Sequence, residues 1–546
     1  MSRFKKVVIF AAMVLITVAA LFAIRRIEYK MDDIINEKRL RFSGDVRNAP
    51  PAVAFTSVAL GSFRGLIADI LWLRSEGLKA KKSYFEMVQL ARWITDLQPN
   101  YSGGTAYLAW NLAYNISVTT SDYEDRWRWV NEGISLIRDK ALLYNPDDPV
   151  LYKELAWIFY HKLGNTMDDA HLTYKKNLGE QMIAILGVEP DLEAIAAAPD
   201  SWKGFLEKHD ENSSLMQAVK KAKYANIEAV YDAFKTASPA VLPENLRVVI
   251  SEHDYRALDS FFRSELLKER MKLDARRMVA LDKRYGKFDW RLPETQAIYW
   301  ATMGIERTPA KRDLQCARLL TQALMSSFRV GRLLTVNGHI PENVPLGPNL
   351  ALVDSAYQAF IDTQNEYEKN NRYGSFYSAR INYTKDAIVL LYTHGNISKA
   401  REYFRKLIKE DGPQKQKTLD EFVMVEFAED VRDSDSTRVT ALINELIYRS
   451  IMSVVYGDEE TAVGMERLAR YIHKTYTAKN ADVKRNQIPS YKDMKKGVLQ
   501  ACERMFSPAM LTILKTYLAR EESEVREGQK NDPSAANREA AGKEGR

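Results

Sequence analysis

Histidine is the residue best suited to acid–base chemistry near neutral pH and to binding zinc, and the chain has seven. None stands in His-Glu-x-x-His or in another metal-ligand spacing. Glu252-His253-Asp254 places three polar side chains at successive positions, which point in different directions on a helix and cannot hold one metal ion together. We therefore expect no metal site. The histidines are His161, His171, His209, His253, His339, His394 and His473.

Motifs for nucleophilic or phosphate chemistry are also missing from the sequence. There is no Gly-x-Ser-x-Gly elbow, no glycine-rich phosphate loop ahead of a lysine and no dinucleotide-binding fingerprint. The pair Gly103-Gly104 lies at the entry of an expected helix and is simply interpreted as a turn. The sequence thus predicts a protein that is not an enzyme and that takes no cofactor.

Aromatic residues are numerous, and a cluster of them could line a ligand-binding box. At helical spacing, however, large aromatic side chains more often pack between helices. We therefore interpret the tryptophans as packing residues. They are Trp72, Trp93, Trp110, Trp127, Trp129, Trp157, Trp202, Trp290 and Trp300.

Length and composition are those of an ordinary globular protein. The 546 residues suffice for more than one domain, and 46% hydrophobic with 28% charged residues excludes wholesale disorder. The net charge of +7 comes from 79 basic and 72 acidic residues spread along the chain. A nucleic-acid binder would more often show a basic stripe interleaved with aromatics, whereas the nearest stretch, residues 266–272, is short and mixed in sign. We expect no nucleic-acid partner.

A membrane anchor is predicted near the N-terminus. The run Val7–Ile24 is free of charge and apolar except for Thr17. Its length corresponds to about 27 Å of helix, close to the hydrocarbon thickness of a bilayer. A cleaved signal peptide is the alternative, but the run leads straight into Arg25 and Arg26 and offers a poor cleavage site. We therefore predict a single-pass protein that binds the membrane through Val7–Ile24.

The orientation of this anchor follows less directly, because basic residues flank the span on both sides. A short basic tail before a single span most often stays in the cytoplasm. We therefore expect an extracytoplasmic body, on the periplasmic side, with a cytoplasmic-facing body as the alternative. The competing residues are Arg3, Lys5 and Lys6 before the span and Arg25, Arg26, Lys30 and Lys38 after it.

The chain has only two cysteines, Cys316 and Cys502, far apart in the sequence. This excludes a disulfide-dense scaffold and a cysteine-based zinc module. A single long-range bridge remains open, but two buried thiols are the simpler interpretation.

Residues 68–178 alternate helix and turn three times. In the helix over residues 84–97, apolar residues recur every third or fourth position, and Pro99 ends it because proline lacks the N–H that a helix interior needs. The same ending recurs before Pro146. One such helix pair cannot bury both of its faces, so neighbouring pairs must stack. Each ending is followed by an aromatic-rich helix, over residues 107–114 and 152–160.

Met87–Asn100 resembles the second helix of a tetratricopeptide repeat (TPR), in which a small residue, an aromatic residue and a terminal proline lie at fixed offsets. Met87 and Ala91 stand where the family has a small and an aromatic residue, so the two sizes are exchanged. A further unit follows in residues 381–413, with Gly395, Ala400 and Phe404 at the turn, small and aromatic positions. The third repeat of the first block matches through Tyr152, Leu155, Ala156, Phe159, Gly164, Ala170 and Tyr174.

This resemblance covers roughly a quarter of the chain and implies an all-α fold: a TPR-like helical-repeat (α-solenoid) array behind a single N-terminal transmembrane helix. In the family, the first helix of each repeat lines a concave groove that holds peptides of other proteins. Asn111 and Asn115 lie four apart on such a helix, and Lys153 is placed to face the same groove. The alternative is that these are solvated polar residues beside turns. His339, in a loop rich in glycine and proline, is the other candidate contact.

The expected organisation has six parts. A tail and anchor (1–24) and a juxtamembrane stalk (25–52) precede TPR-like repeats (53–186); then come a helical region (187–350) with a Gly/Pro-rich loop (331–349), a helical region (351–520) with the TPR-like unit 381–413, and a disordered tail (521–546). Within them we expect one amphipathic helix over 215–235 and a short hairpin near 333–340. The tail is expected to be disordered because it has almost no bulky apolar residue.

Two functions follow from these observations. The first is a membrane-anchored helical-repeat scaffold or assembly factor that mediates protein–protein interactions in the cell envelope. The second is an enzyme or ligand-binding protein of unrecognised class with its site in 187–350. Loss of partner capture on replacing groove residues would favour the scaffold, and loss of activity on replacing acids or histidines in 187–350 would favour the second.

Overall fold

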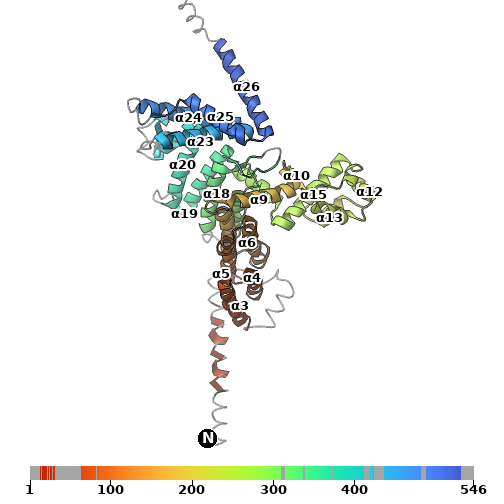
Figure 1. Ribbon diagram of the computed structural model, residues 1–546. Helices are drawn as coiled ribbons and strands as arrows, with labels where there is room; N and C mark the ends of the chain where they lie inside the picture. The colour runs from red at the N-terminus through yellow and green to blue at the C-terminus, as the bar shows by residue number, and fades with distance from the viewer. Residues whose placement is uncertain are drawn as a thin grey trace, which may run out of the picture. The chain divides into compact units, whose positions relative to one another are not determined.

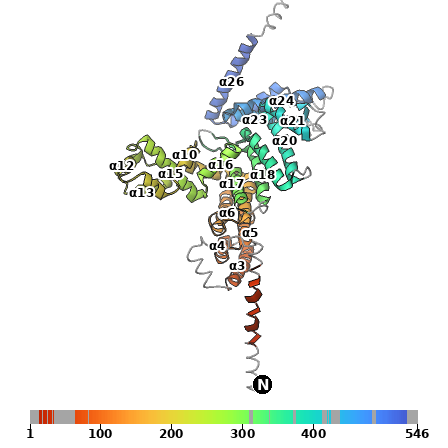
Figure 2. The ribbon, with the colours of Figure 1, turned by 180° about the vertical axis from the view of Figure 1, so that it is seen from behind.

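The structure is a computed structural model, in which the described part of the chain is almost entirely helical (Figure 1; Figure 2 from behind). It describes residues 63–308, 314–369, 374–410, 436–480 and 487–530 apart from positions 82, 336, 337 and 343, together with scattered residues in 13–33 and 418–423. The prediction of an all-α protein is confirmed.

The chain forms two compact units. Unit 1 comprises residues 1–175, 267–273 and 296–320, and unit 2 comprises 176–266, 274–295 and 321–546. Four helices contribute residues to both units. They are α9 (His171–Leu186), α15 (Glu252–Met271), α17 (Pro293–Arg307) and α18 (Leu314–Val330).

Unit 1 contains the first two helix pairs and the first helix of the third pair, whose second helix is α9. The second helix of the first pair ends at Leu97, before Pro99, and that of the second pair ends at Tyr144, before Pro146, as expected. The helices are α3 (Phe63–Ala80), α4 (Tyr84–Leu97), α5 (Ser102–Trp110), η1 (Asn111–Ile116), η2 (Ser117–Thr119), α6 (Tyr123–Ser135), η3 (Leu136–Ala141), α7 (Leu142–Tyr144), α8 (Pro149–Trp157) and η4 (Ile158–Gly164).

The two proline-terminated helix ends contact each other directly. Asn145, next to Pro146, donates from Nδ2 to the carbonyl of Pro99 at 2.5 Å. Asp96 accepts from the hydroxyl of Tyr144 at 2.9 Å and pairs with Lys140 at 2.7 Å. These contacts join the end of the first proline-terminated helix to the end of the second. Equivalent ends of neighbouring pairs are thereby fixed side by side.

Three stretches of unit 1 are π-helical: η1, η3 and η4. In η1 the N–H of Ser117 bonds to the carbonyl of Leu112, five residues back, where an α-helix would bond four back. Such widened turns are rare and rotate the side chains that follow them. No feature of the sequence predicted them.

The first part of unit 2 is a run of short helices, α10 (Leu192–Ala197), α11 (Trp202–Lys208), α12 (Ser214–Lys221), α13 (Ile227–Thr236) and α14 (Glu244–Arg247). The first four begin after a side chain that caps an N–H three residues on, from Asp191, Ser201, Ser213 and Asn226. The single helix expected over 215–235 is therefore wrong. Asn226 starts a new helix there, and Lys223 has a positive φ of 66° that no α-helix accommodates.

The rest of unit 2 comprises α16 (Ala275–Tyr285), η5 (Leu350–Leu352), α19 (Val353–Glu368), α20 (Ser375–Thr393), α21 (Ile397–Glu410), α23 (Ser436–Val455), α24 (Glu459–Lys479), α25 (Tyr491–Met505) and α26 (Pro508–Lys530). The pair α20–α21 is the helical hairpin predicted for 381–413. Gly395 forms its turn with a φ of 80°, a conformation that favours glycine, and Ala400 is fully buried.

Two predictions in unit 2 need comment. Strands β1 (Arg332–Leu333) and β2 (Leu346–Gly347) pair antiparallel, so the short hairpin exists but reaches beyond 340. Disorder from residue 521 is wrong for 521–530, which continue α26. These residues are mostly Glu, Arg, Lys and Gln, which have high helix propensity. Residues 531–546 lie outside the described part of the chain.

The predicted anchor is described only in part. The described members of Val7–Ile24 are helical and exposed, and the remaining positions of the run lie outside the described residues. Among the residues that the structure describes, no helix has the length and mean hydropathy needed to cross a membrane. The described members are Met13, Leu15, Ile16, Val18, Ala19, Ala20, Phe22 and Ala23.

Both cysteines are buried free thiols, as the simpler interpretation predicted. Cys316 lies in unit 1 and Cys502 in unit 2. Burial raises the pKa of the Cys502 thiol, so it stays protonated and unreactive near neutral pH.

Close helix packing in unit 2 gives a test of the fold. A Cβ added to Gly464 of α24 would overlap the backbone carbonyl of Thr393 at the end of α20, whereas a Cβ at the exposed Gly497 of α25 would meet no atom within 4 Å. We expect Gly464→Ala to lower the free energy of unfolding by about 1–3 kcal/mol through forced separation of the two helices.

Gly497→Ala is the matched control and should raise stability by about 0.5–1 kcal/mol, because glycine is a poor helix former. Urea denaturation followed by circular dichroism measures both. Equal effects of the two substitutions would show that α24 does not approach α20 as described.

Candidate functional site

A row of stacked aromatic rings lies along unit 1. We define the aromatic ladder as Trp72, Tyr107, Trp110, Tyr114, His161 and Trp157, in order of contact. Neighbouring ring centroids are 4.4–6.5 Å apart, and four of the five contacts are close to parallel. Offset stacking at such distances is favourable for aromatic side chains.

The ladder is assembled from the first helix of each of the three helix pairs. Tyr107, Trp110 and Tyr114 lie at helical spacing on α5 and η1, so they share one face. Trp157 and His161 lie four apart at the junction of α8 and η4, with ring centroids 4.4 Å apart. Trp72 comes from α3 and stacks on Tyr107 at 5.6 Å. The helix pairs thus bring together rings that are far apart in sequence.

The middle of the ladder is open to solvent. Tyr107 is 42% exposed and Trp110 is 36% exposed, whereas residues of the core are buried. Exposed tryptophan and tyrosine in one row is unusual for a monomer's surface and is typical of a binding face. The general interpretation of the tryptophans as packing residues therefore does not describe Trp110, nor Trp93 of α4, which is 48% exposed.

Asn111 and Asn115 do lie together, but on the inner side of η1. Asn111 is buried; its Nδ2 donates to the carbonyl of Tyr107 at 3.2 Å, and its Oδ1 accepts from Nδ2 of Asn115 at 2.5 Å. These bonds tie the π-helical turn to the α-helix before it. The structure thus places Asn111 where it supports Tyr107, and leaves the rings themselves at the surface.

The two other candidate contacts lie elsewhere. Lys153 of α8 is half-buried and pairs with the adjacent Glu154 at 2.6 Å. His339 belongs to unit 2 and is exposed next to the turn at Gly338. Three of the four candidates therefore belong to unit 1, namely Asn111, Asn115 and Lys153, whereas His339 belongs to unit 2.

A buried charge lies directly behind the ladder. The ammonium of Lys162 is 5.3 Å from the ring centre of Tyr114 and 5.8 Å from that of Tyr174, and it pairs with Asp168. The side chains of Lys162 and Asp168 are only 4% and 8% exposed. A lysine enclosed by two aromatic faces gains cation–π attraction, but only the carboxylate balances its charge.

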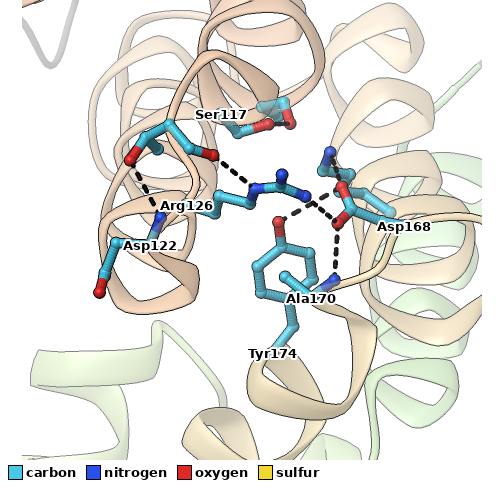
Figure 3. Close-up of polar contacts among 9 residues, drawn as sticks. Ser117, Asp122, Arg126, Asp168, Ala170 and Tyr174 are labelled. Carbon is cyan, nitrogen blue, oxygen red and sulfur yellow. Dashed lines mark hydrogen bonds and ion pairs between the residues drawn. The ribbon is translucent and has the colours of Figure 1, made fainter.

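Asp168 is the centre of a larger network (Figure 3). It accepts from the N–H of Ala170 at 2.9 Å and from the hydroxyl of Tyr174 at 3.4 Å, and it pairs with Arg126 at 3.3 Å. Arg126 in turn donates from Nε to the carbonyl of Thr120 at 2.8 Å. One carboxylate therefore joins η4, the loop that follows it, α9 and α6.

Burial sets the ionisation of these groups. It lowers the pKa of Lys162, which the bond to Asp168 only partly restores. Burial acts to raise the pKa of Asp168, but the bonds from Lys162 and Ala170 outweigh it and leave that pKa below its usual range. Burial, with the neighbouring charge of Lys162, lowers the pKa of His161. His161 is consequently neutral at pH 7, and a neutral ring stacks on Trp157.

The arrangement holds no catalytic set. The phenol of Tyr114 shares a hydrogen bond of 3.2 Å with Nδ1 of His161, and its pKa is raised by burial and by Glu154, so it is not a base. Within the described ranges, no group of three or more His, Cys, Asp or Glu side chains could hold a metal ion. What the ladder offers chemically is a flat, apolar and rigid surface with hydrogen-bonding edges.

Searches of family models, of curated proteins and of solved structures gave no match to this chain.

The ion pair behind the ladder gives the second prediction. Asp168→Asn leaves Lys162 as an uncompensated buried charge and should lower the free energy of unfolding by about 3–5 kcal/mol. Urea denaturation followed by tryptophan fluorescence measures this, because seven of the nine tryptophans belong to unit 1.

Glu132→Gln is the control, since Glu132 and its partner Arg92 are about two-fifths to a half exposed and such a pair contributes less than about 1 kcal/mol. The loss in Asp168→Asn should also depend on pH. The stabilisation by ionised Asp168 is present at neutral pH and disappears as the pH falls through its lowered pKa. A variant as stable as the wild-type protein at pH 7 would contradict the assignment.

Proposed function

We propose that the protein is a membrane-anchored helical-repeat scaffold or assembly factor that binds other proteins in the cell envelope. The observation that carries the proposal is the aromatic ladder on the first helices of unit 1. The helical-repeat architecture and the anchor at Val7–Ile24 are parts of this proposal, supported by the stacked helix pairs of unit 1 and by the apolar N-terminal run.

The partner segment that suits the ladder is extended and apolar, and rich in proline. In the ladder, neighbouring ring centroids are 5.5–6.5 Å apart from Trp72 through Tyr107 and Trp110 to Tyr114. An extended polyproline helix has three residues per turn and rises about 3.1 Å per residue, so the side chains of one face recur about every 9 Å and a few turns run the length of the row. Aromatic-lined surfaces bind such segments because a proline-rich chain loses little conformational entropy on binding.

Rigidity of the ladder supports this role. Asn111, held by Asn115, bonds to the backbone carbonyl of Tyr107 and so ties η1 to α5, which carries Tyr107. Lys162 lies against Tyr114 and is held by Asp168. A surface that is ordered before binding keeps more of its contact energy as affinity. Asn111 and Asn115 are therefore proposed to act on partner capture through Tyr107. Lys153, four residues before Trp157 on α8, is the proposed contact of a bound chain at that end of the ladder.

The third prediction concerns partners in living cells. A photoreactive benzophenone residue at position 107 or 110, in the full-length protein, should give discrete cross-linked products. Their partner proteins, identified by mass spectrometry, should be envelope components, because the body is proposed to be extracytoplasmic. The same group at Arg128 of α6, 75% exposed in its side chain and absent from the ladder, is the control and should give no discrete product.

Two results would count against the proposal. Equal products from positions 107 and 128 would remove the ladder as the binding face. Products that contain only cytosolic proteins would place the body on the other side of the membrane and favour a cytoplasmic adaptor.

A further inference from the structure

Unit 2 contains a cavity of about 600 Å³ that the proposed scaffold function does not use. It is lined by the C-terminal half of α9, the start of α10, one face of α16 and the segment 287–291, with Arg332 and Asn349 at its edge. Sites for small organic molecules typically have volumes of about 300–1,000 Å³. The cavity therefore has the size of a ligand site, and it lies in the part of the chain where the alternative function placed one.

One wall of the cavity is apolar. It is formed by side chains from α9, α16 and the segment after α16, and most of them are buried. Such a wall favours the body of an organic molecule over a hydrated ion. These residues are Met182, Leu186, Val279, Phe288 and Trp290.

Most charged groups of the lining already have partners. Asp289 pairs with Arg291 at 2.7 Å and accepts from the N–H of Leu333 at 2.8 Å. Arg332 pairs with Asp458 and donates to the carbonyl of Pro348. Lys283 and Glu193, both about two-thirds exposed, pair with each other at 3.4 Å. These contacts hold the walls in place and leave little charge directed at the interior.

Asp282 of α16 is the exception. Its Oδ1 accepts from the N–H of Phe288 at 3.2 Å and from Nε1 of Trp290 at 3.1 Å. Among the described residues, no hydrogen bond or ion pair was found to its Oδ2. Burial raises the pKa of Asp282 to about 6, against the lowering effects of these two donors and of Lys287. One oxygen of this carboxylate is thus held by two donors beside the apolar wall, and the other oxygen is available to bind a ligand.

We propose that the cavity binds a small organic amine, whose ammonium donates to Oδ2 of Asp282 while its apolar body lies against Phe288 and Trp290. An organic acid of the same shape would face the carboxylate and is excluded by like charge. A bound ammonium supplies a charged donor to the half-buried carboxylate, and hydrogen bonds between charged groups are the strong ones. The site is separate from the aromatic ladder and does not depend on the ladder's role.

The fourth prediction tests this site in the full-length protein by isothermal titration calorimetry. The probe is 2-phenylethylamine, with 3-phenylpropanoic acid as an acid of similar size. We expect saturable binding of the amine and none of the acid. Asp282→Asn keeps an oxygen for the Phe288 and Trp290 donors but loses the charge, and it should weaken amine binding by at least about tenfold.

The affinity should also depend on pH. The amine stays protonated throughout, whereas Asp282 takes up a proton as the pH falls through about 6. Amine binding should therefore weaken by about tenfold between pH 7 and pH 5. The other titratable and charged groups that line the cavity are Asp191 and Glu193 from α10, Lys283 from α16, Lys287, Asp289 and Arg291 from the following segment, and Arg332 from β1.

Two further variants make the test specific. Asp232→Asn removes an exposed carboxylate of α13 in the same unit, outside the cavity, and should leave binding unchanged. Leu192→Trp fills part of the cavity from its half-buried edge and should abolish binding even if Asp282→Asn folds poorly. No saturable binding of the amine, equal binding of the acid, or unchanged affinity in Asp282→Asn or Leu192→Trp would each overturn the proposal.

Discussion

The buried pair of Lys162 and Asp168 is the interaction on which unit 1 most depends. Neither charge is solvated, since their side chains are 4% and 8% exposed, so each is tolerable only because the other is present. Through Arg126, Tyr174 and the N–H of Ala170, the same carboxylate connects α6, the loop after η4 and the start of α9. Hydrophobic packing could tolerate small shifts of these segments, but a buried charge network cannot, because its bonds require particular distances.

This network also explains why the aromatic rings keep their order. Lys162 follows His161 in the chain and lies against the ring of Tyr114, so the position of its ammonium fixes two neighbouring members of the ladder. The Asn111–Asn115 pair does the same for Tyr107. Polar groups are thus buried behind the ladder while aromatic groups remain in front of it. This is the reverse of the usual distribution, and it favours a surface that is completed by a partner.

Much of the local structure could be predicted from the sequence. The helix ends before Pro99 and Pro146, the hairpin turn at Gly395 and the start of α26 at Pro508 follow from backbone chemistry at single residues. The prediction of one helix over 215–235 was wrong because the apolar periodicity continues across Asn226. The capping bond of Asn226 starts a separate helix there. Disorder was expected from 521 on composition, although helix propensity alone carries α26 to Lys530.

The two proposed binding sites depend on long-range contacts, which have weaker signals in the sequence. Trp72 and Tyr107 are far apart in the chain, and no periodicity shows that their rings stack. The sequence predicted an aromatic-rich helix over residues 107–114, but it could not show that Tyr107 and Trp110 are exposed. Asn111 was found by its spacing to Asn115, but neither its burial nor the π-helical turn in which it lies has a signal in the sequence. The cavity beside Asp282 joins segments from α9 to Asn349, so only the fold reveals it.

The most direct test of the aromatic ladder as a binding face is a fluorescence titration of the full-length protein with a proline decapeptide. A Gly-Ser peptide of the same length is the comparison, and Trp110→Ala is the matched variant. The account predicts a saturable change in tryptophan emission with the proline peptide, no saturable change with the Gly-Ser peptide, and loss of the response in Trp110→Ala without a change in helicity. Equal responses to the two peptides, or a response that survives in Trp110→Ala, would contradict it.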